Sequence, residues 1–168
     1  GSINNIEKYK SEIKRYPEFY DVWFKEDIHH EHAFTKIHVR VKQEIVTASF
    51  GGVDLSKTAR RLKPEELNNF YETGKDFIIV DARNDYESVI GKFKNAITPK
   101  MDTFRDWPKI AEELEHFKDK TVVTYCTGGI RCEKASALLV EKGFKDVYQI
   151  DGGIWNYITQ HPDKYWEG

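Results

Sequence analysis

The apolar positions in the first quarter of the chain follow two different periods. In residues 3–15 they recur every three or four residues, which is typical of one face of a helix, and Pro17 would end that helix. Residues 19–25 then have the pattern of a strand. From Phe34 to Lys42 apolar and basic side chains alternate, so we expect a half-buried strand with a basic outer face. The basic residues of that face are Lys36, His38, Arg40 and Lys42.

The rest of the chain alternates short apolar runs with helical patterns. The apolar runs predict buried strands at 77–81, 121–125 and 147–150. Helical spacing and helix-ending glycines predict helices at 64–74, 85–90, 107–117, 131–142 and from 153 onward. This alternation is typical of an α/β domain, an open parallel sheet with helices on both faces. Residues 51–62 have the composition of a linker.

Composition narrows the classes of function. The 26 basic and 28 acidic residues nearly cancel, so contact with RNA must come from a local patch. No apolar run approaches the ~20 residues that span a membrane. The two cysteines lie close together, which is not a secreted disulfide framework and favours a cytoplasmic protein. No cofactor motif is evident, and no metal site is expected at the histidine cluster, His29, His30 and His32.

Cys126 stands where a strand gives way to a glycine loop and a helix. The loop residues that follow it are Thr127, Gly128, Gly129, Ile130 and Arg131. In open parallel sheets, ligands bind beyond the carboxyl ends of the strands. Cys126 is therefore expected at the binding edge of the sheet.

Three features of this loop favour a thiolate at Cys126. The glycines let successive N–H groups turn toward one point, the helix N-terminus adds partial positive charge, and Arg131 adds a full charge. Each effect lowers the pKa of a thiol. We predict a nucleophilic or sulfur-carrying cysteine. A buried structural cysteine beside a helix-capping turn is the alternative.

The loop and two flanking motifs resemble those of the rhodanese family. Cys-x-x-x-x-Arg at 126–131 is similar to the rhodanese active-site loop. The string from Asp81 to Glu87 resembles the D-x-R-x-x-x-E signature that follows an early strand, and 151–155 resembles the closing Gly-Gly signature. The resemblance implies a rhodanese-like sheet and a catalytic role for Cys126.

A narrower resemblance covers nearly the whole chain. The loop string at 126–134, the string at 42–46 and the ending at 165–168 resemble the bacterial rhodanese-containing tRNA uridine hydroxylases. This resemblance implies oxygen-dependent 5-hydroxylation of the wobble uridine of tRNA, dependent on the loop cysteine. It also implies tRNA as the partner.

The same resemblance implies a domain organisation. Residues 1–56 would be a partial ferredoxin-like (α+β) segment with its linker, and residues 57–168 would be the rhodanese domain. We expect the chain to be a fragment, because the family begins earlier and continues into a cysteine-bearing tail. The oligomeric state is not predicted, although uncovered apolar faces in residues 3–50 are compatible with a dimer.

Two further functions fit the loop. A sulfurtransferase moves sulfane sulfur from thiosulfate to a thiol or cyanide and uses the same cysteine chemistry. A non-catalytic rhodanese-like binding module needs no nucleophile, so the retention of Cys126 argues against it. Cysteine phosphatases of this fold use one residue more than the six from Cys126 to Arg131, because their cradle holds a tetrahedral group.

Three other residues are candidates for supporting roles. Asp81 is expected to accept hydrogen bonds from the loop backbone or the loop arginine, or else to be an ordinary strand-end cap. Arg83 is expected to contact substrate or Glu87. Cys132 either resolves an oxidised loop sulfur or points into the core.

The basic strand face is the candidate RNA-binding surface. Lysine and arginine side chains there can contact successive phosphates, and a solvated strand face is the alternative. Linker residues that can extend this patch are Lys57, Arg60, Arg61 and Lys63.

Overall fold

The computed structural model describes most of the chain. The described residues are 2–22, 24, 26, 39–44 and 46–168. They form two compact units, Gly1–Val41 and Lys42–Gly168, which are described separately below. None of the helices among these residues is long and apolar enough to cross a membrane.

The first unit begins with α1 (Ile3–Ile13), which confirms the predicted helix. A 3₁₀ turn at Pro17–Phe19 follows it. The predicted strand at 19–25 is wrong over its described beginning, because the Val22 N–H donates to the carbonyl of Phe19 and the backbone curls. The chain curls here because Pro17 begins the 3₁₀ turn, and the fixed φ of proline suits the first turn of a helix.

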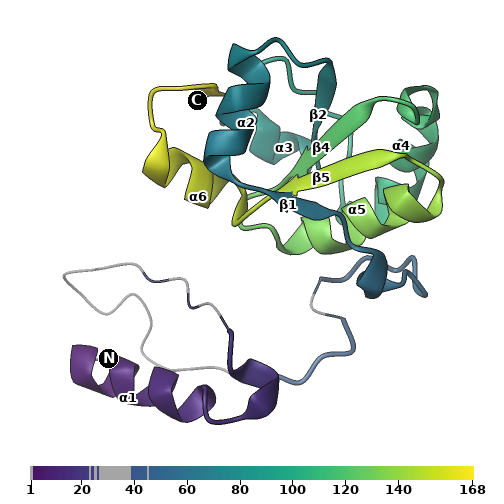
Figure 1. Cartoon of the computed structure of the whole chain (residues 1–168). Coiled ribbons are helices and arrows are strands. Elements are labelled where there is room, and N and C mark those ends of the chain that lie inside the picture. The colour runs from purple at the N-terminus through teal and green to yellow at the C-terminus, as the bar shows by residue number, and fades with distance from the viewer. Residues whose placement is uncertain (1, 23, 25, 27–38, 45) are drawn as a thin grey trace. The chain divides into compact units, whose positions relative to one another are not determined.

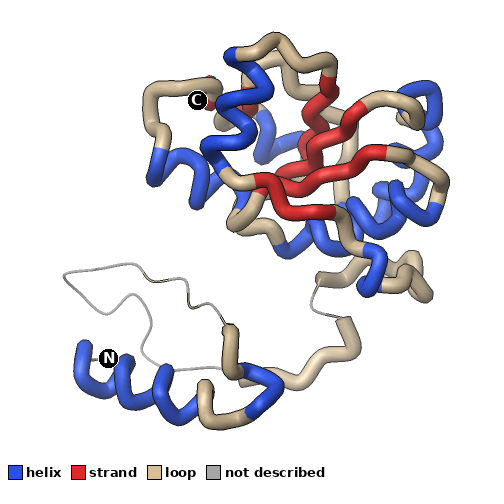
Figure 2. Tube along the Cα trace, in the orientation of Figure 1, coloured by secondary structure: helices blue, strands red, loops and turns tan. Residues whose placement is uncertain are grey.

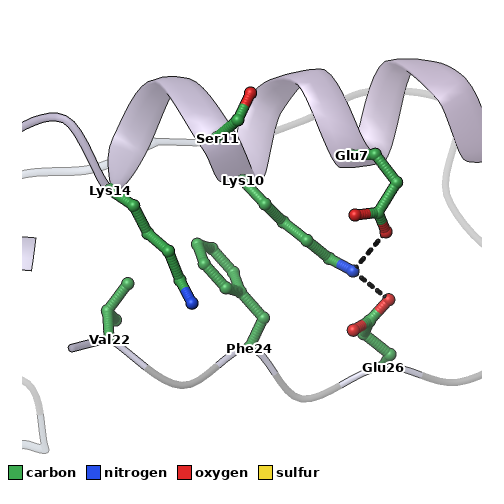
Figure 3. A pocket seen from close by; sticks show the side chains of 7 residues that line it. All are labelled: Glu7, Lys10, Ser11, Lys14, Val22, Phe24 and Glu26. Carbon is green, nitrogen blue, oxygen red and sulfur yellow. Dashed lines mark hydrogen bonds and ion pairs between the residues drawn. The ribbon is translucent and has the colours of Figure 1, made fainter. Parts of the chain in front are cut away.

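Polar and aromatic contacts join α1 to the segment that follows (Figure 3). Lys10 donates to Glu7 at 2.6 Å and to Glu26 at 2.5 Å. The ring of Phe24 lies 6.4 Å from that of Tyr9, edge to face. A cavity of about 470 Å³ lies between these elements.

The predicted basic strand is only partly described. Val39 to Lys42 have no strand structure, and Arg40 and Lys42 are exposed. Lys36 and His38 lie outside the described residues, as does the histidine cluster. An isolated strand is not stable without a neighbour to complete its hydrogen bonds, and Val39 to Lys42 have no such neighbour among the described residues.

Four parallel strands form the main sheet of the second unit (Figure 2). They are β1 (Arg60–Leu62), β2 (Phe77–Asp81), β4 (Thr121–Tyr125) and β5 (Asp146–Ile150). Their order in the sheet is β1-β5-β4-β2. The strand that carries the site, β4, is therefore central, with β5 on one side and β2 on the other.

Helices cover both faces of this sheet (Figures 1 and 2). On one face lie α2 (Pro64–Glu72) and α6 (Gly153–Gln160), and on the other lie α4 (Trp107–Glu113) and α5 (Ile130–Glu141). Each face has its own apolar core, because alternate residues of a strand point to opposite sides. Thus the open parallel sheet with helices on both faces is confirmed.

Neighbouring residues of β4 show this division. Val122 packs with Trp107 on the side of α4 and α5, whereas Val123 packs with Leu67 and Tyr157 on the side of α2 and α6. All five side chains are fully buried. The site therefore stands on a strand fixed from both faces.

The region expected to be a linker is part of the domain. It contains a 3₁₀ turn at Leu55–Lys57 and the edge strand β1, so the linker assignment at 51–62 is wrong. The basic residues of β1 gave this segment the composition of a linker, but they make contacts at the edge of the sheet. Arg60 pairs with Asp146 at 2.6 Å and lies over the ring of Tyr148.

The division between the units also lies earlier than the expected one after residue 56. Ala48 is buried in the core of the second unit, with Val46 and Phe50 packed beside it. Glu44 pairs with Lys134 of α5 at 3.4 Å. These contacts assign residues 42–56 to the second unit.

Two short elements had no signal in the sequence. They are β3 (Lys92–Phe93) and β6 (Trp166–Glu167), which pair antiparallel. The brief helix expected at 85–90 is present as α3 (Asp85–Ser88). A Cβ on Gly91 would lie 2.7 Å from the Trp166 ring, so β6 fits closely over a glycine. Two residues are too few to show a period.

The start of α6 is joined to the loop after β4. The N–H of Ile154 donates to the carbonyl of Cys126 at 2.9 Å, and that of Trp155 donates to the carbonyl of Thr127 at 3.0 Å. Gly153 makes this approach possible: its φ is +66°, and a Cβ there would lie 2.4 Å from the carbonyl oxygen of Cys126. Glycine alone satisfies both conditions.

Burial of Leu67 predicts a measurable loss of stability. Leu67→Ala removes a fully buried side chain and is expected to lower the free energy of unfolding by about 2–5 kcal/mol, as measured by urea denaturation. Leu55→Ala is the matched control, because Leu55 is 48% exposed and should lose less than about 1 kcal/mol. Equal losses for the two variants would contradict the described core.

The close approach at Gly153 predicts a second, local effect. Gly153→Ala should displace the loop and slow alkylation of Cys126, because its Cβ would meet loop backbone. Gly143→Ala is the control: its φ is +88°, but nothing lies within 4 Å of its Cβ. Both variants should lose about 1–2 kcal/mol of stability from backbone strain. Slower alkylation is expected in Gly153→Ala alone; the same rate in both variants would refute the steric explanation.

Candidate active site

The candidate site is the loop from Cys126 to Arg131, between the carboxyl end of β4 and the start of α5. Adjacent strands place two other segments beside it, α3 after β2 and the start of α6 after β5. This is the edge of an open parallel sheet at which ligands bind. The predicted position of the loop agrees with the structure.

Backbone N–H groups surround the sulfur of Cys126. The N–H of Gly129 donates to Sγ at 3.2 Å, and those of Arg131 and Cys132 also hydrogen-bond to it. Gly129 has a φ of +89°, which directs its N–H inward and which glycine adopts without strain. Cys126 itself is 2% exposed, so the sulfur lies at the bottom of this cradle.

The surroundings lower the pKa of the Cys126 thiol to about 6. The largest contribution is a hydrogen bond from the thiol of Cys132. Burial opposes it, while backbone N–H groups and the charge of Arg131 act in the same direction. A cysteine with this pKa is mostly thiolate at neutral pH, and the thiolate is the nucleophilic form.

Cys132 points into the core, as one of the two alternatives considered for it expected. It lies in the first turn of α5 and is fully buried, which raises the pKa of its own thiol well above the usual value. A group that keeps its proton can donate it in a hydrogen bond, and here the acceptor is the sulfur of Cys126. Cys132 is thus a core residue that also touches the reactive sulfur.

Glu87 holds the arginine of the loop. The guanidinium of Arg131 makes a bidentate ion pair with the Glu87 carboxylate, at 2.6 and 2.8 Å. The Thr127 hydroxyl donates to the same carboxylate at 3.3 Å. Burial raises the pKa of Glu87, but the hydrogen bonds from Arg131 outweigh this, and the net pKa is below its usual range. Sequence reasoning named Glu87 as part of a signature and as an expected partner of Arg83, and it gave Glu87 no role at the loop.

Asp81 and Arg83 form a buried ion pair behind the loop. Arg83 donates to both carboxylate oxygens of Asp81, the shortest bond being 2.6 Å. Of the two alternatives expected for Asp81, the structure shows the strand-end cap: its carboxylate accepts hydrogen bonds from the Arg83 N–H at 3.0 Å and from the Arg83 guanidinium, two residues after the end of β2.

The expected contact of Arg83 with Glu87 exists, but through the backbone. Arg83 donates to the carbonyl of Glu87 at 3.3 Å and to that of Gly91 at 2.7 Å. Arg83 is 6% exposed, and its hydrogen bonds fix the segment that carries Glu87.

The basic strand face was the other set of candidates. Arg40 and Lys42 are exposed, and the complete basic strand face remains a prediction because Lys36 and His38 lie outside the described residues. Within the described ranges no group of three His, Cys, Asp or Glu side chains could hold a metal ion.

Comparison with protein families identifies both parts of the chain. Residues 63–160 match the family described as rhodanese-like domain, and residues 1–45 match that described as UPF0176 acylphosphatase like domain.

Named relatives match over the whole chain. The tRNA uridine(34) hydroxylase of Cytophaga hutchinsonii is 45% identical over 169 residues, which cover 100% of this chain and 54% of the relative. The protein of the same name from Acholeplasma laidlawii is 43% identical, with 100% and 54% covered. The chain therefore spans about half the length of these curated relatives.

Solved structures share the fold of the second unit. The crystal structure of reduced Bacillus anthracis CoADR-RHD has a TM-score of 0.54 at 24% identity, covering 67% of this chain and 19% of that one. A rhodanese-like domain from Anabaena sp. gives 0.53 at 20% identity, covering 64% and 78%. The family match, which takes in more than half of the chain, and this shared fold show that the chain belongs to the rhodanese-like family.

Proposed function

We propose that this chain acts in the 5-hydroxylation of uridine 34 of tRNA. The observation that carries the proposal is the 45% identity to a tRNA uridine(34) hydroxylase over the full length of the chain, including both of its units. A rhodanese-like domain alone occurs with many activities, because function resides in sites and not in folds. The match beyond residues 63–160 therefore favours tRNA.

In this proposal the Cys126 thiolate is the essential nucleophile. Backbone N–H groups of Gly129, Arg131 and Cys132 stabilise its negative charge, and the same cradle suits an oxidised or persulfide form of the sulfur. Glu87 positions Arg131, and Cys132 supplies the hydrogen bond that lowers the pKa of Cys126 most.

We further propose molecular oxygen as the source of the new hydroxyl group. Insertion of one oxygen atom into a C–H bond leaves the second atom to be reduced to water by two electrons and two protons, so the proposal includes an external two-electron reductant as co-substrate. A tRNA substrate supports a cytoplasmic location. It also supports phosphate contacts from basic side chains, for which Arg40 and Lys42 are the described candidates of the basic strand face.

A second candidate function is that of a sulfurtransferase. The observation that favours it is the low pKa of a sulfur enclosed by N–H groups, which would also hold the terminal sulfur of a persulfide. This chemistry does not depend on RNA. Thiosulfate:cyanide turnover by the purified chain, lost in Cys126→Ala, would promote this function over hydroxylation.

Genetic complementation tests the hydroxylase function. Deletion of the chromosomal gene should abolish 5-hydroxyuridine-derived nucleosides at position 34, as measured by mass spectrometry of bulk tRNA. Wild type should restore them and Cys126→Ala should not, because the alanine has no sulfur. Growth under ¹⁸O₂ should label the hydroxyl group. Unchanged modification in the deletion strain would refute the hydroxylase function, and full activity of Cys126→Ala would refute the role of the sulfur.

The contacts of Cys126 predict the pH dependence of its reactivity. The rate of alkylation by iodoacetamide, followed by peptide mass spectrometry, should rise with pH around a midpoint of about 6 in the wild type. Cys132→Ala removes the largest cause of the low pKa and should raise the midpoint toward the ordinary ~8.5.

The control for this measurement is Cys132→Ser, which keeps a hydrogen-bond donor of similar size. It should retain a midpoint nearer to that of the wild type than to that of Cys132→Ala. An unchanged midpoint in Cys132→Ala would show that the thiol of Cys132 does not act on Cys126.

A further inference from the structure

Large apolar side chains stand exposed on one side of the Cys126 loop. Tyr86, Val89 and Ile90 are 64%, 87% and 78% exposed. They fall at helical spacing on α3 and the residues directly after it, so they share one face. Glu87, the neighbour of Tyr86, binds Arg131 of the loop, which holds α3 beside the cradle.

A second aromatic side chain stands on the other side. Trp155, in the first turn of α6, is 38% exposed, and its N–H donates to the carbonyl of Thr127 at 3.0 Å. Ile130, which belongs to the loop itself, is 46% exposed.

The order of the strands places these two aromatics on opposite sides of the sulfur. Tyr86 follows β2 and Trp155 follows β5, while Cys126 follows β4, which lies between them. The labels α3 and α6 in Figure 1 mark the two segments. The buried sulfur therefore lies between two elements that each carry an exposed aromatic residue.

An apolar rim around a charged, buried nucleophile indicates a bound ligand. Single exposed apolar residues need no explanation, but a group of them at one site marks a binding surface. The two elements beside the loop carry the flat aromatic rings of Tyr86 and Trp155, so this apolar surface fits a flat ligand that stacks. An unpaired nucleobase has this shape, and every base offers a face for stacking.

We propose that Tyr86 and Trp155 stack on the uracil base of an unpaired uridine and lower it toward the sulfur of Cys126. This rests on the proposed function, and it names the residues that recognise the base. A base inside a duplex cannot reach a sulfur that is 2% exposed, so only a looped or flipped-out uridine is a substrate.

Charge on the same edge of the sheet complements this proposal. Lys63 is exposed at the carboxyl end of β1, which is two strands from β4. An ammonium group there suits a phosphate of the RNA backbone that leads to the stacked base. The aromatics would read the base while the lysine contributes affinity that does not depend on the base.

Binding of two RNA hairpins tests the stacking. One hairpin carries a single uridine in its loop, and the other carries an abasic nucleotide at that position. Tyr86→Ala and Trp155→Ala should each weaken binding of the uridine hairpin by between 5-fold and 150-fold, which corresponds to ~1–3 kcal/mol per stacked base. Neither variant should change binding of the abasic hairpin.

Further variants separate stacking from loss of structure. Trp155→Phe keeps an aromatic face and should recover part of the affinity, and Tyr20→Ala, at a 76% exposed tyrosine of the first unit, serves as the matched control. In addition, 5-iodouridine in the hairpin loop should cross-link on irradiation to Tyr86 or Trp155, as identified by peptide mass spectrometry.

The outcomes distinguish the two proposals. The stacking proposal is overturned if the wild type prefers the uridine hairpin but both alanine variants bind that hairpin as tightly as the wild type does. It is also overturned if the cross-links fall on other residues. In both cases the hydroxylase function stands. If the wild type binds neither hairpin, stacking is overturned and the complementation result alone decides the function.

Discussion

A negatively charged sulfur at Cys126 must be stabilised in a position that excludes water. Burial by itself favours the neutral thiol, so the low pKa requires donors placed before any substrate arrives. The loop supplies them from its own backbone, and Cys132 adds one from the core. This requirement explains the turn at Gly129, because only a tightly curled chain directs several N–H groups to one atom.

The turn is held by the two neighbouring segments. The start of α6 hydrogen-bonds to two loop carbonyls, and Gly153 has no side chain so that the backbones can meet. On the other side, Arg83 fixes the backbone of Glu87, whose carboxylate holds Arg131. The buried ion pair at Asp81 thus acts on the loop through an intermediate, which is how a residue without contact to the sulfur contributes to the site.

The sequence predicted those parts of the structure that depend on local pattern. The strands at 77–81 and 121–125 match β2 and β4, because continuous β-branched runs between turns are characteristic of buried parallel strands. β1 was missed because its two arginines lie on a sheet edge, where charge is tolerated. The loop around Cys126 was located correctly, whereas the partner of Asp81 stayed open between two alternatives, since pairing among several nearby donors depends on three-dimensional distances.

The loop and its surroundings contribute different kinds of specificity. A thiolate in a ring of N–H groups reacts with electrophilic or oxidising groups. Any chain that folds this loop has the same reactivity, so the loop alone does not choose the substrate. The choice of substrate must then come from the side chains around the ring, which a substrate meets before it reaches the sulfur. In this chain the exposed residues at that position are apolar and aromatic on both flanks. Free thiosulfate, a small and strongly hydrated dianion, gains little from such a rim, whereas a nucleobase gains stacking energy from it.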